Sequence, residues 1–311
     1  MKVLFMGTPD FAVGILRAIC ESGDHEVVAV VTQPDRPKGR KGDPVPSPVK
    51  QYAESCGISV LQPVKIKTEE EVEKLRGIDA DIYVVAAFGQ ILSREILDIP
   101  RYGCINVHAS LLPEYRGAAP IQWAIADGRE YTGVTVQQMN EGVDTGDIIS
   151  SKTVPVDDDE TGETLFDKLM KAGAELITDT LDLIENGTAQ RIPQDESKAT
   201  YAKILKKEMG RIDFNMSADE IERRIRAFTP WPGGYTYLGD RMIKIKKCAV
   251  SPEEAQGAPG QVIRVTKDEI AVSCAKGALL VTAIQPEGKK EMRVHDFLLG
   301  NSVNTGDILG G

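Results

Sequence analysis

The chain has 311 residues, more than the roughly 100–200 residues of one ordinary domain, so we expect two domains. Hydrophobic residues make up 41% of the sequence and charged residues 27%, as in globular proteins. No apolar run reaches the ~18–20 residues that a membrane span needs, which excludes a membrane-spanning protein and predicts a soluble one.

The five cysteines and three histidines lack the spacings that are typical of metal sites. Neither a Cys-x-x-Cys nor a His-Glu-x-x-His pattern is present, which argues against zinc. An odd number of scattered thiols suits a reducing compartment, and residues 1–7 are typical of a first β-strand rather than a signal peptide. We therefore expect a cytoplasmic protein without a metal.

The net charge of −10 is unevenly distributed along the chain. From residue 203 onward there are 17 Lys and Arg against 14 Asp and Glu, which leaves 20 against 33 for residues 1–202. The first part of the chain is therefore acidic and the second mildly basic. This asymmetry fits a second domain that contacts a polyanion, although it is also within ordinary surface variation.

Apolar runs alternate with helix-like segments in the first part of the chain. We predict strands at residues 3–6, 27–32, 81–87 and 104–107, and helices at residues 11–21, 48–56 and 118–126. This alternation is typical of an α/β domain with a mostly parallel, Rossmann-like sheet. Because residues 82–87 show almost no polar alternation, their strand is expected at the centre of the sheet, covered on both faces.

A long helix, a polar stretch and a β-rich region follow. Leucines at helical spacing predict one helix over residues 161–186. Residues 189–205 are predicted as a linker between a first domain at residues 1–188 and a second domain at residues 206–311. Short β-rich runs after Gly234 predict a small antiparallel barrel, for which the nucleic-acid-binding five-stranded OB type is one candidate.

Three polar residues suggest the chemistry of the site. Asn106 and His108 stand two residues apart at the end of a predicted strand, so they point to the same side of the sheet, at the edge where α/β sheets bind ligands. Asp144 lies between two glycines in a later loop. An amide, an imidazole and a carboxylate together stabilise an oxyanion and handle an amine proton, which indicates direct acyl transfer to an amine. The alternatives are a strand-end pair bonded to loop backbone and a turn-capping aspartate.

These residues lie in motifs that resemble the folate-dependent formyltransferases. The resemblance rests on Asn106-x-His108, on residues 110–117, on residues 144–146, and on residues 3–12 and 226–234. It covers nearly the whole chain. The motif at residues 3–12 and the second domain are similar to those of the family members that formylate the methionine on initiator tRNA for translation initiation. The resemblance implies 10-formyltetrahydrofolate as formyl donor, no metal and no obligate protein partner.

The resemblance also implies roles for individual residues. Asn106 and His108 would stabilise the oxyanion, and Asp144 would position His108 and assist protonation of the departing folate nitrogen. The segments that resemble the folate site contain Phe88, Gln90 and Leu92; Ser110, Leu111, Leu112 and Pro113; and Glu141, Gly142 and Val143. From the sequence alone, Phe88 and Leu92 are equally well explained as core residues.

A basic loop follows the second predicted strand and contains Arg36, Lys38, Arg40 and Lys41. A solvated surface loop is the ordinary explanation of such a run of charges. The resemblance implies instead that the loop binds the acceptor end of tRNA, with Arg40 as its central contact. In the second domain, Lys206 and Lys207 are further candidate phosphate contacts.

Other functions stay open at this stage. With a sugar-nucleotide acceptor the basic loop would hold a diphosphate, whereas a hydrolase acting on formyl-tetrahydrofolate would give it no role. A free ribonucleotide acceptor, as in the purine-pathway formyltransferases, is opposed by the second domain, since those enzymes resemble the first domain alone, and by the basic loop. The absence of a Gly-x-Gly-x-x-Gly fingerprint opposes a dinucleotide-dependent oxidoreductase. The acidic net charge and the lack of an aromatic stacking motif oppose a non-catalytic RNA-binding module.

We expect Arg40→Ala to weaken the use of tRNA because one phosphate contact is lost, while the use of folate is unchanged. Steady-state kinetics in which each substrate is varied in turn measure the two effects separately. Unchanged tRNA kinetics in this variant would contradict the assignment of Arg40.

Overall fold

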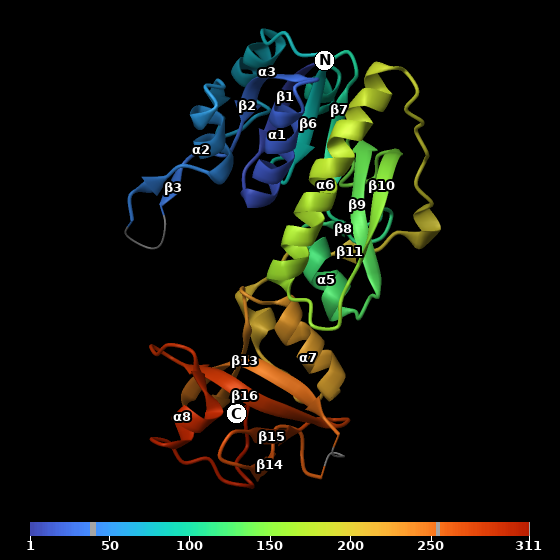
Figure 1. The fold of residues 1–311 in the computed structure, drawn as a ribbon. Coiled ribbons are helices and arrows are strands. Elements are labelled where there is room, and N and C mark those ends of the chain that lie inside the picture. Colours follow the sequence, from blue (N-terminus) through green and yellow to red (C-terminus); the bar gives the residue numbers. More distant parts are fainter. Residues whose placement is uncertain (38–41, 253–255, 311) are drawn as a thin grey trace. The chain divides into compact units, whose positions relative to one another are not determined.

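The computed structural model describes residues 1–37, 42–252 and 256–310 (Figure 1). The chain forms two compact units. Unit 1 consists of Met1–Pro120, Tyr131–Pro155 and Phe166–Ala202, and unit 2 consists of Ile121–Glu130, Val156–Leu165 and Lys203–Gly311. Two short segments of the predicted first domain thus pack with unit 2, and the division of the chain at residues 189–205 stays a prediction.

Unit 1 is built on a seven-stranded sheet. Its strands are β1 (Lys2–Gly7), β2 (Glu26–Val31), β5 (Val60–Leu61), β6 (Ile82–Ala86), β7 (Cys104–His108), β9 (Tyr131–Gln138) and β10 (Ile148–Pro155). The strand order is β10-β9-β7-β6-β1-β2-β5. The five strands from β7 to β5 are parallel, whereas β9 and β10 run antiparallel to their neighbours. The predicted mostly parallel sheet is therefore confirmed, and β6 is central and fully buried as expected.

Helices cover both faces of this sheet (Figure 1). They are α1 (Asp10–Ser22), α2 (Pro48–Ser55), α3 (Glu69–Arg76), α4 (Arg94–Leu97) and α6 (Gly162–Glu185). The short α5 (Pro120–Ala126) lies mostly in unit 2. On one face α6 packs beside α1, where the rings of Phe11 and Phe166 meet at 5.8 Å. A Cβ on Gly173 would lie 3.3 Å from Val107, so this glycine allows α6 to approach β7 closely.

The opposite face of the sheet carries the core formed with α3 and α4. Alternate residues of β1 and β6, such as Leu4 and Tyr83, pack there against Val72 and Leu75 of α3 and Ile96 of α4. The period of two along each strand sends the intervening residues to the α1 and α6 side. None of the helices in the described ranges combines the length and apolar character required to cross a membrane.

Four very short strands complete unit 1. They are β3 (Arg36–Pro37), β4 (Pro44–Val45), β8 (Arg116–Gly117) and β11 (Tyr201–Ala202). β3 and β4 pair antiparallel on either side of the predicted basic loop. β8 and β11 pair parallel, so the chain that follows α6 returns to the segment after β7.

Unit 2 is built on an antiparallel sheet, and two helices belong to it in addition to most of α5. Its strands are β12 (Gly234–Leu238), β13 (Arg241–Ser251), β14 (Val262–Val265), β15 (Ile270–Ser273), β16 (Ala278–Pro286) and β17 (Met292–Arg293), and its helices are α7 (Ala218–Ala227) and α8 (Val294–Leu298). The order is β12-β13-β16-β15-β14, with β17 beside β16. Single residue pairs join Leu238 to Leu309 and Gln261 to Ile308, so the C-terminal segment touches both outer strands. The predicted antiparallel sheet is confirmed, and in the described part of the chain no continuous ladder closes it into a barrel.

Helix α7 begins with a capping box. Ser217 Oγ accepts a hydrogen bond from the backbone N–H of Glu220, and the Glu220 carboxylate accepts one from the backbone N–H of Ser217. The two bonds satisfy N–H groups that have no partner within the helix. Ile221 and Ile225 then place the helix in the core of unit 2.

We expect Ser217→Ala to lower the free energy of unfolding by about 1 kcal/mol, because the N-cap acceptor is lost. Denaturant titration followed by circular dichroism measures this change. Ser302→Ala, at an exposed position, is the control and should unfold like the wild type. Equal stability of the Ser217 and Ser302 variants would contradict a stabilising role of the cap.

Candidate active site

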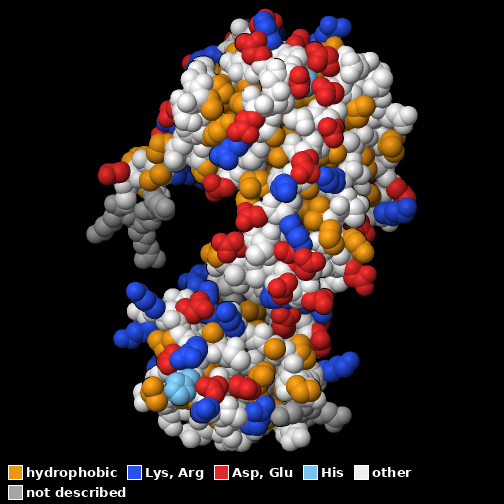
Figure 2. Space-filling model, viewed as in Figure 1, with side chains coloured by type: hydrophobic (Ala, Val, Ile, Leu, Met, Phe, Trp, Pro, Cys, Tyr) orange, Lys and Arg blue, Asp and Glu red, His pale blue; other side chains and the backbone are white. Residues whose placement is uncertain are grey.

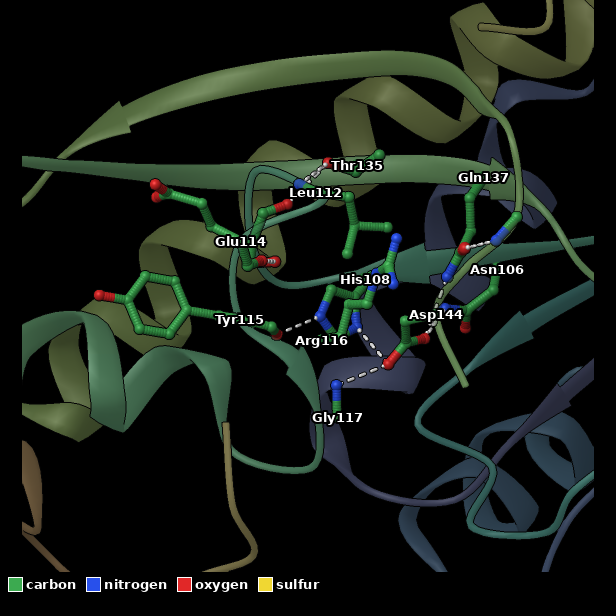
Figure 3. Close-up of polar contacts among 12 residues, drawn as sticks. Asn106, His108, Leu112, Glu114, Tyr115, Arg116, Gly117, Thr135, Gln137 and Asp144 are labelled. Atoms are coloured by element: carbon green, nitrogen blue, oxygen red, sulfur yellow. Dashed lines mark hydrogen bonds and ion pairs between the residues drawn. The ribbon is translucent and has the colours of Figure 1, made fainter. Parts of the chain in front are cut away.

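The three predicted catalytic residues meet at the end of β7 (Figure 3). Asn106 and His108 lie on the strand, and Asp144 comes from the loop between β9 and β10. Asn106 Nδ2 is 3.4 Å from Asp144 Oδ1, and His108 Nδ1 is 3.6 Å from Asp144 Oδ2. All three side chains are largely shielded from solvent. The structure thus brings together the amide, the imidazole and the carboxylate that the sequence suggested.

The carboxylate of Asp144 is held by further donors. Its Oδ2 accepts a hydrogen bond of 2.8 Å from the backbone N–H of Gly117, and its Oδ1 accepts one of 3.0 Å from Gln137 Nε2. These partners come from other segments of the chain, so Asp144 is not a simple turn-capping aspartate. Its backbone has φ +53°, in the left-handed region that non-glycine residues rarely adopt. Such a conformation persists where surrounding contacts fix it.

The imidazole of His108 lies between two acceptors. Nε2 is 2.9 Å from the backbone carbonyl oxygen of Tyr115, and Nδ1 faces Asp144. Tyr115 also has a left-handed backbone, with φ +56°. The sequence left open that His108 only binds loop backbone. Nε2 does bind a backbone oxygen, that of Tyr115, but Nδ1 faces the carboxylate of Asp144. A substrate that bonds to His108 must replace one of these contacts.

The turn formed by Ser110, Leu111, Leu112 and Pro113 is bonded to β9. Thr135 Oγ1 donates to the Ser110 carbonyl oxygen at 2.7 Å and accepts from the Leu112 N–H at 3.1 Å. The hydroxyl of Ser110 donates to the carbonyl oxygen of Glu114 at 2.6 Å. Leu112 is buried, whereas Leu111 and Pro113 are partly exposed. The turn is thus rigidly placed beside His108, with Leu111 and Pro113 as its accessible side chains.

The segment with Phe88, Gln90 and Leu92 follows β6 directly. The side chains of Phe88 and Leu92 belong to the core on the α3 and α4 side, so the core explanation holds for both side chains. Gln90 accepts from the Ile66 N–H at 2.9 Å and donates to the Pro63 carbonyl oxygen at 3.0 Å. Ile91, between them, exposes 60% of its surface. What this segment presents to a ligand is therefore Ile91 and backbone.

The third predicted folate segment is the exposed turn of Glu141, Gly142 and Val143. The Gly142 N–H donates to Asn140 Oδ1 at 3.0 Å, and Thr145 Oγ1 donates to the same atom at 2.7 Å. A Cβ on Gly142 would lie only 2.1 Å from Thr145 Oγ1, so a larger residue here would displace the Thr145 hydroxyl from its bond to Asn140. Val143, which precedes Asp144 in the sequence, exposes 55% of its surface. Like Ile91 in the loop after β6, it is an apolar side chain that is not buried.

The predicted tRNA contacts are only partly within the described residues. Arg36 is exposed on β3 and donates to Gln33 Oε1 at 3.3 Å. Lys206 and Lys207 are exposed in unit 2. Lys38, Arg40 and Lys41 lie outside the described residues. The described cations are thus accessible, as a contact with phosphate requires, and their role stays a prediction.

Several residues that shape the site were not predicted. Gln137 belongs to β9, a strand that the sequence analysis did not predict, although the run from Tyr131 to Gln138 is rich in β-branched residues. Gly117 binds Asp144 through its backbone N–H, a group that every residue except proline has, so the sequence does not single it out. Arg116 was part of a matching motif without an assigned role, and Gln194 lay in the predicted linker. Their contacts could not be inferred from local sequence.

The described residues offer no activated cysteine or serine nucleophile beside the three residues. Cys104, on the same strand, is fully buried, and burial raises the pKa of its thiol. The Ser110 hydroxyl is bonded to a carbonyl oxygen rather than to a base. An amide, an imidazole and a carboxylate on an α/β sheet, without such a nucleophile, define an enzyme that passes an acyl group directly between two substrates.

Comparison with known proteins agrees with this class. Residues 1–181 match the family described as formyl transferase, and residues 204–302 match the formyl transferase C-terminal domain. The chain belongs to the formyl transferase family.

The chain is similar over its whole length to proteins named methionyl-tRNA formyltransferase. It is 51% identical to the one from Lachnospira eligens, over 100% of both chains, and 52% identical to the one from Agathobacter rectalis, over 99% of both. Among solved structures, the sugar 3N-formyl transferase WlaRD has a TM-score of 0.67 at 21% identity, over 93% of this chain and 99% of that one. This last likeness supports the fold.

We expect Asp144→Asn to lower kcat for formyl transfer by roughly 100-fold or more, as for other groups that orient a catalytic imidazole. An asparagine amide has one donor face, which would oppose either the Gly117 N–H or Gln137 Nε2. Asp147→Asn, three residues along the same loop, is the control and should keep kcat. A similar loss in both variants would indicate general damage to the loop.

Proposed function

We propose that this chain transfers the formyl group of 10-formyltetrahydrofolate to the free amino group of the methionine on initiator tRNA, giving formylmethionyl-tRNA. The observation that carries the proposal is the meeting of Asn106, His108 and Asp144 at the carboxyl end of β7. Relatives that match both units at about half of all positions carry the name methionyl-tRNA formyltransferase, which supports the choice of acceptor.

In the reaction one carbon–nitrogen bond forms and another breaks. The neutral amine of the methionine attacks the formyl carbon, and the carbonyl electron pair moves to oxygen. The oxyanion collapses, the bond from the formyl carbon to N10 of the folate breaks, and N10 takes up the proton that the amine gives up. The products are the formylated amine and tetrahydrofolate, so no covalent enzyme intermediate is needed.

The residues at the end of β7 supply what this path requires. The Asn106 amide donates a hydrogen bond to the developing oxyanion, and His108 Nε2 donates a second one when the substrate replaces the Tyr115 carbonyl oxygen. Both side chains are largely buried, which strengthens these bonds. Asp144 accepts from Asn106 and faces the His108 ring, which fixes both donors. A free α-amino group titrates near about 7.7–8.0, so neutral pH already provides attacking amine. Positioning and oxyanion stabilisation therefore carry most of the catalysis.

The folate is placed, in this proposal, against two loops. The loops after β6 and β9 each leave one large apolar side chain unburied, Ile91 and Val143. Flat aromatic ligands are held by apolar contacts of this kind together with a few backbone hydrogen bonds. The turn of residues 110–113 adds the partly exposed Leu111 and Pro113. Phe88, Gln90 and Leu92 act through their backbone and by fixing the loop.

The tRNA is bound, in this proposal, through local positive charge rather than through net charge. Figure 2 shows Lys and Arg side chains spread among acidic ones over the visible surface of unit 2. Arg36 of unit 1 and Lys206 and Lys207 of unit 2 are exposed and free to contact phosphates, together with the predicted contacts Lys38, Arg40 and Lys41. Phosphate contacts depend on such local charges, so an acidic chain is no obstacle.

The acceptor is tested by a formyl-transfer assay with 10-formyltetrahydrofolate and initiator Met-tRNA, glycinamide ribonucleotide, an amino-sugar nucleotide or no acceptor. We expect transfer to the tRNA alone. His108→Ala should reduce kcat by about 100- to 1000-fold, since an oxyanion donor is lost. His295→Ala, at a partly exposed histidine of unit 2, is the control and should keep kcat.

The assay separates the alternatives directly. Transfer to the sugar nucleotide would make the chain a sugar N-formyltransferase, and release of formate without an acceptor would make it a hydrolase. Either result would keep the chemistry of the site and overturn the proposed acceptor. Full activity in His108→Ala would overturn the site.

A further inference from the structure

Gln194 reaches the loop of Asp144 from a distant part of the chain. It follows α6 by nine positions and lies in the segment predicted as a linker. Its Nε2 donates to the backbone carbonyl oxygens of Asp144 at 2.9 Å and of Gly146 at 2.7 Å. One side-chain amide thus spans both ends of the three-residue stretch that contains the predicted catalytic carboxylate.

The amide of Gln194 is oriented by a buried arginine. Arg116 is fully buried, and its Nε and Nη2 donate to Gln194 Oε1 at 3.0 and 2.8 Å. Because a guanidinium has only donors, the amide oxygen must face it and the NH₂ group must face the loop. Arg116 also forms a paired contact with Glu196 at 2.7 and 2.9 Å, which holds the pKa of that carboxyl below its usual value.

The same short strand holds the carboxylate itself. Gly117, next to Arg116 on β8, donates its backbone N–H to Asp144 Oδ2. β8 therefore holds Asp144 in two ways. Gly117 binds the carboxylate of Asp144 directly, and Arg116 orients Gln194, which binds the backbone carbonyl oxygen of Asp144. On the other side, Gln137 donates to Asp144 Oδ1 and accepts from the Gly146 N–H at 3.0 Å. The loop is held between two glutamine side chains.

The loop needs these contacts because its backbone conformation is unfavourable. Asp144 has φ +53°, a conformation that a non-glycine residue keeps only where its surroundings fix it. Gly146 lies so close to Gln138 that a Cβ would be 1.7 Å from its carbonyl oxygen. With the carbonyl groups of residues 144 and 146 released, the loop can relax to an ordinary conformation that moves the carboxylate away from His108.

We propose that Gln194 is a positioning residue for formyl transfer, which holds Asp144 in place against Asn106 and His108 and is itself oriented by Arg116. The inference rests on the proposed function through the role of Asp144. It assigns a role in catalysis to a residue outside the three that touch the reacting groups, in a segment whose composition indicates only a linker.

The test compares Gln194→Met with the matched control Gln138→Met. Methionine has nearly the same length as glutamine and lacks the two donors. Gln138 Nε2 also donates to two backbone carbonyl oxygens of unit 1, those of Tyr102 at 3.5 Å and Cys104 at 3.0 Å, but its side chain contacts none of the three predicted catalytic residues. Gln138→Met therefore controls for the loss of a side-chain amide that is bonded to backbone carbonyl oxygens, and thermal unfolding of both variants measures the additional cost of leaving Arg116 without Gln194.

We expect Gln194→Met to lower kcat by about 10- to 100-fold, the effect of two hydrogen bonds, with KM for folate and for tRNA within about twofold. Gln194→Glu should do the same, because a carboxylate oxygen would face the two carbonyl oxygens. Gln138→Met should keep kcat. Hydrogen–deuterium exchange of residues 140–150 should become faster in the Gln194 variants than in Gln138→Met.

The two proposals fail in different ways. Wild-type kcat and exchange in both Gln194 variants would overturn the positioning role and leave formyl transfer intact. Equal losses of kcat in Gln194→Met and Gln138→Met would also overturn it. If the wild type transfers no formyl group to Met-tRNA, the proposed function fails, and faster exchange in the Gln194 variants alone would still support the hold on the loop.

Discussion

A carboxylate that is mostly shielded from water must be surrounded by donors, and in unit 1 this requirement gathers the site around Asp144. Its two oxygens face the N–H of Gly117, the amides of Gln137 and Asn106, and the ring of His108. These groups come from β7, β8 and β9, so three elements have to be in place before the charge is satisfied. The carboxylate therefore couples the geometry of Asn106 and His108 to the folding of the sheet.

The sheet provides the room for this arrangement where two neighbouring strands diverge. β6 pairs with β7 up to the partners Val85 and Asn106, and Ala87 then turns away with φ +46°. β7 continues to His108, which pairs with Thr135 of β9 on its other side. The end of β7 is thus uncovered on the β6 side only. Beyond Asn106, β7 therefore has a strand partner on the β9 side alone, and its last side chain, that of His108, lies next to the loop of Asp144.

The sequence predicts those parts of the site that lie on a single strand, where side chains alternate between the two faces of the sheet. Asn106 and His108 were correctly placed on one side of a strand end, because a period of two does not depend on distant partners. Gln137 was missed because β9 was not predicted. Gln194 was missed because a polar, proline-containing stretch gives no sign of whether its side chains bond to protein or to water. Helix α7 was also missed, although Ser217 and Glu220 carry a capping-box signature, since its charged residues outnumber its apolar ones.

The segment between α6 and unit 2 has a composition typical of linkers and contacts typical of a core. Gln194 and Glu196 bind the buried Arg116, and β11 pairs with β8 as the last step before the chain enters unit 2 at Lys203. β8 also provides the N–H of Gly117 that binds Asp144. The point at which the chain leaves unit 1 is therefore fixed by the same short strand that fixes the carboxylate. A segment with the composition of a linker therefore closes the fold of unit 1 and, through Gln194, also holds the backbone of the Asp144 loop.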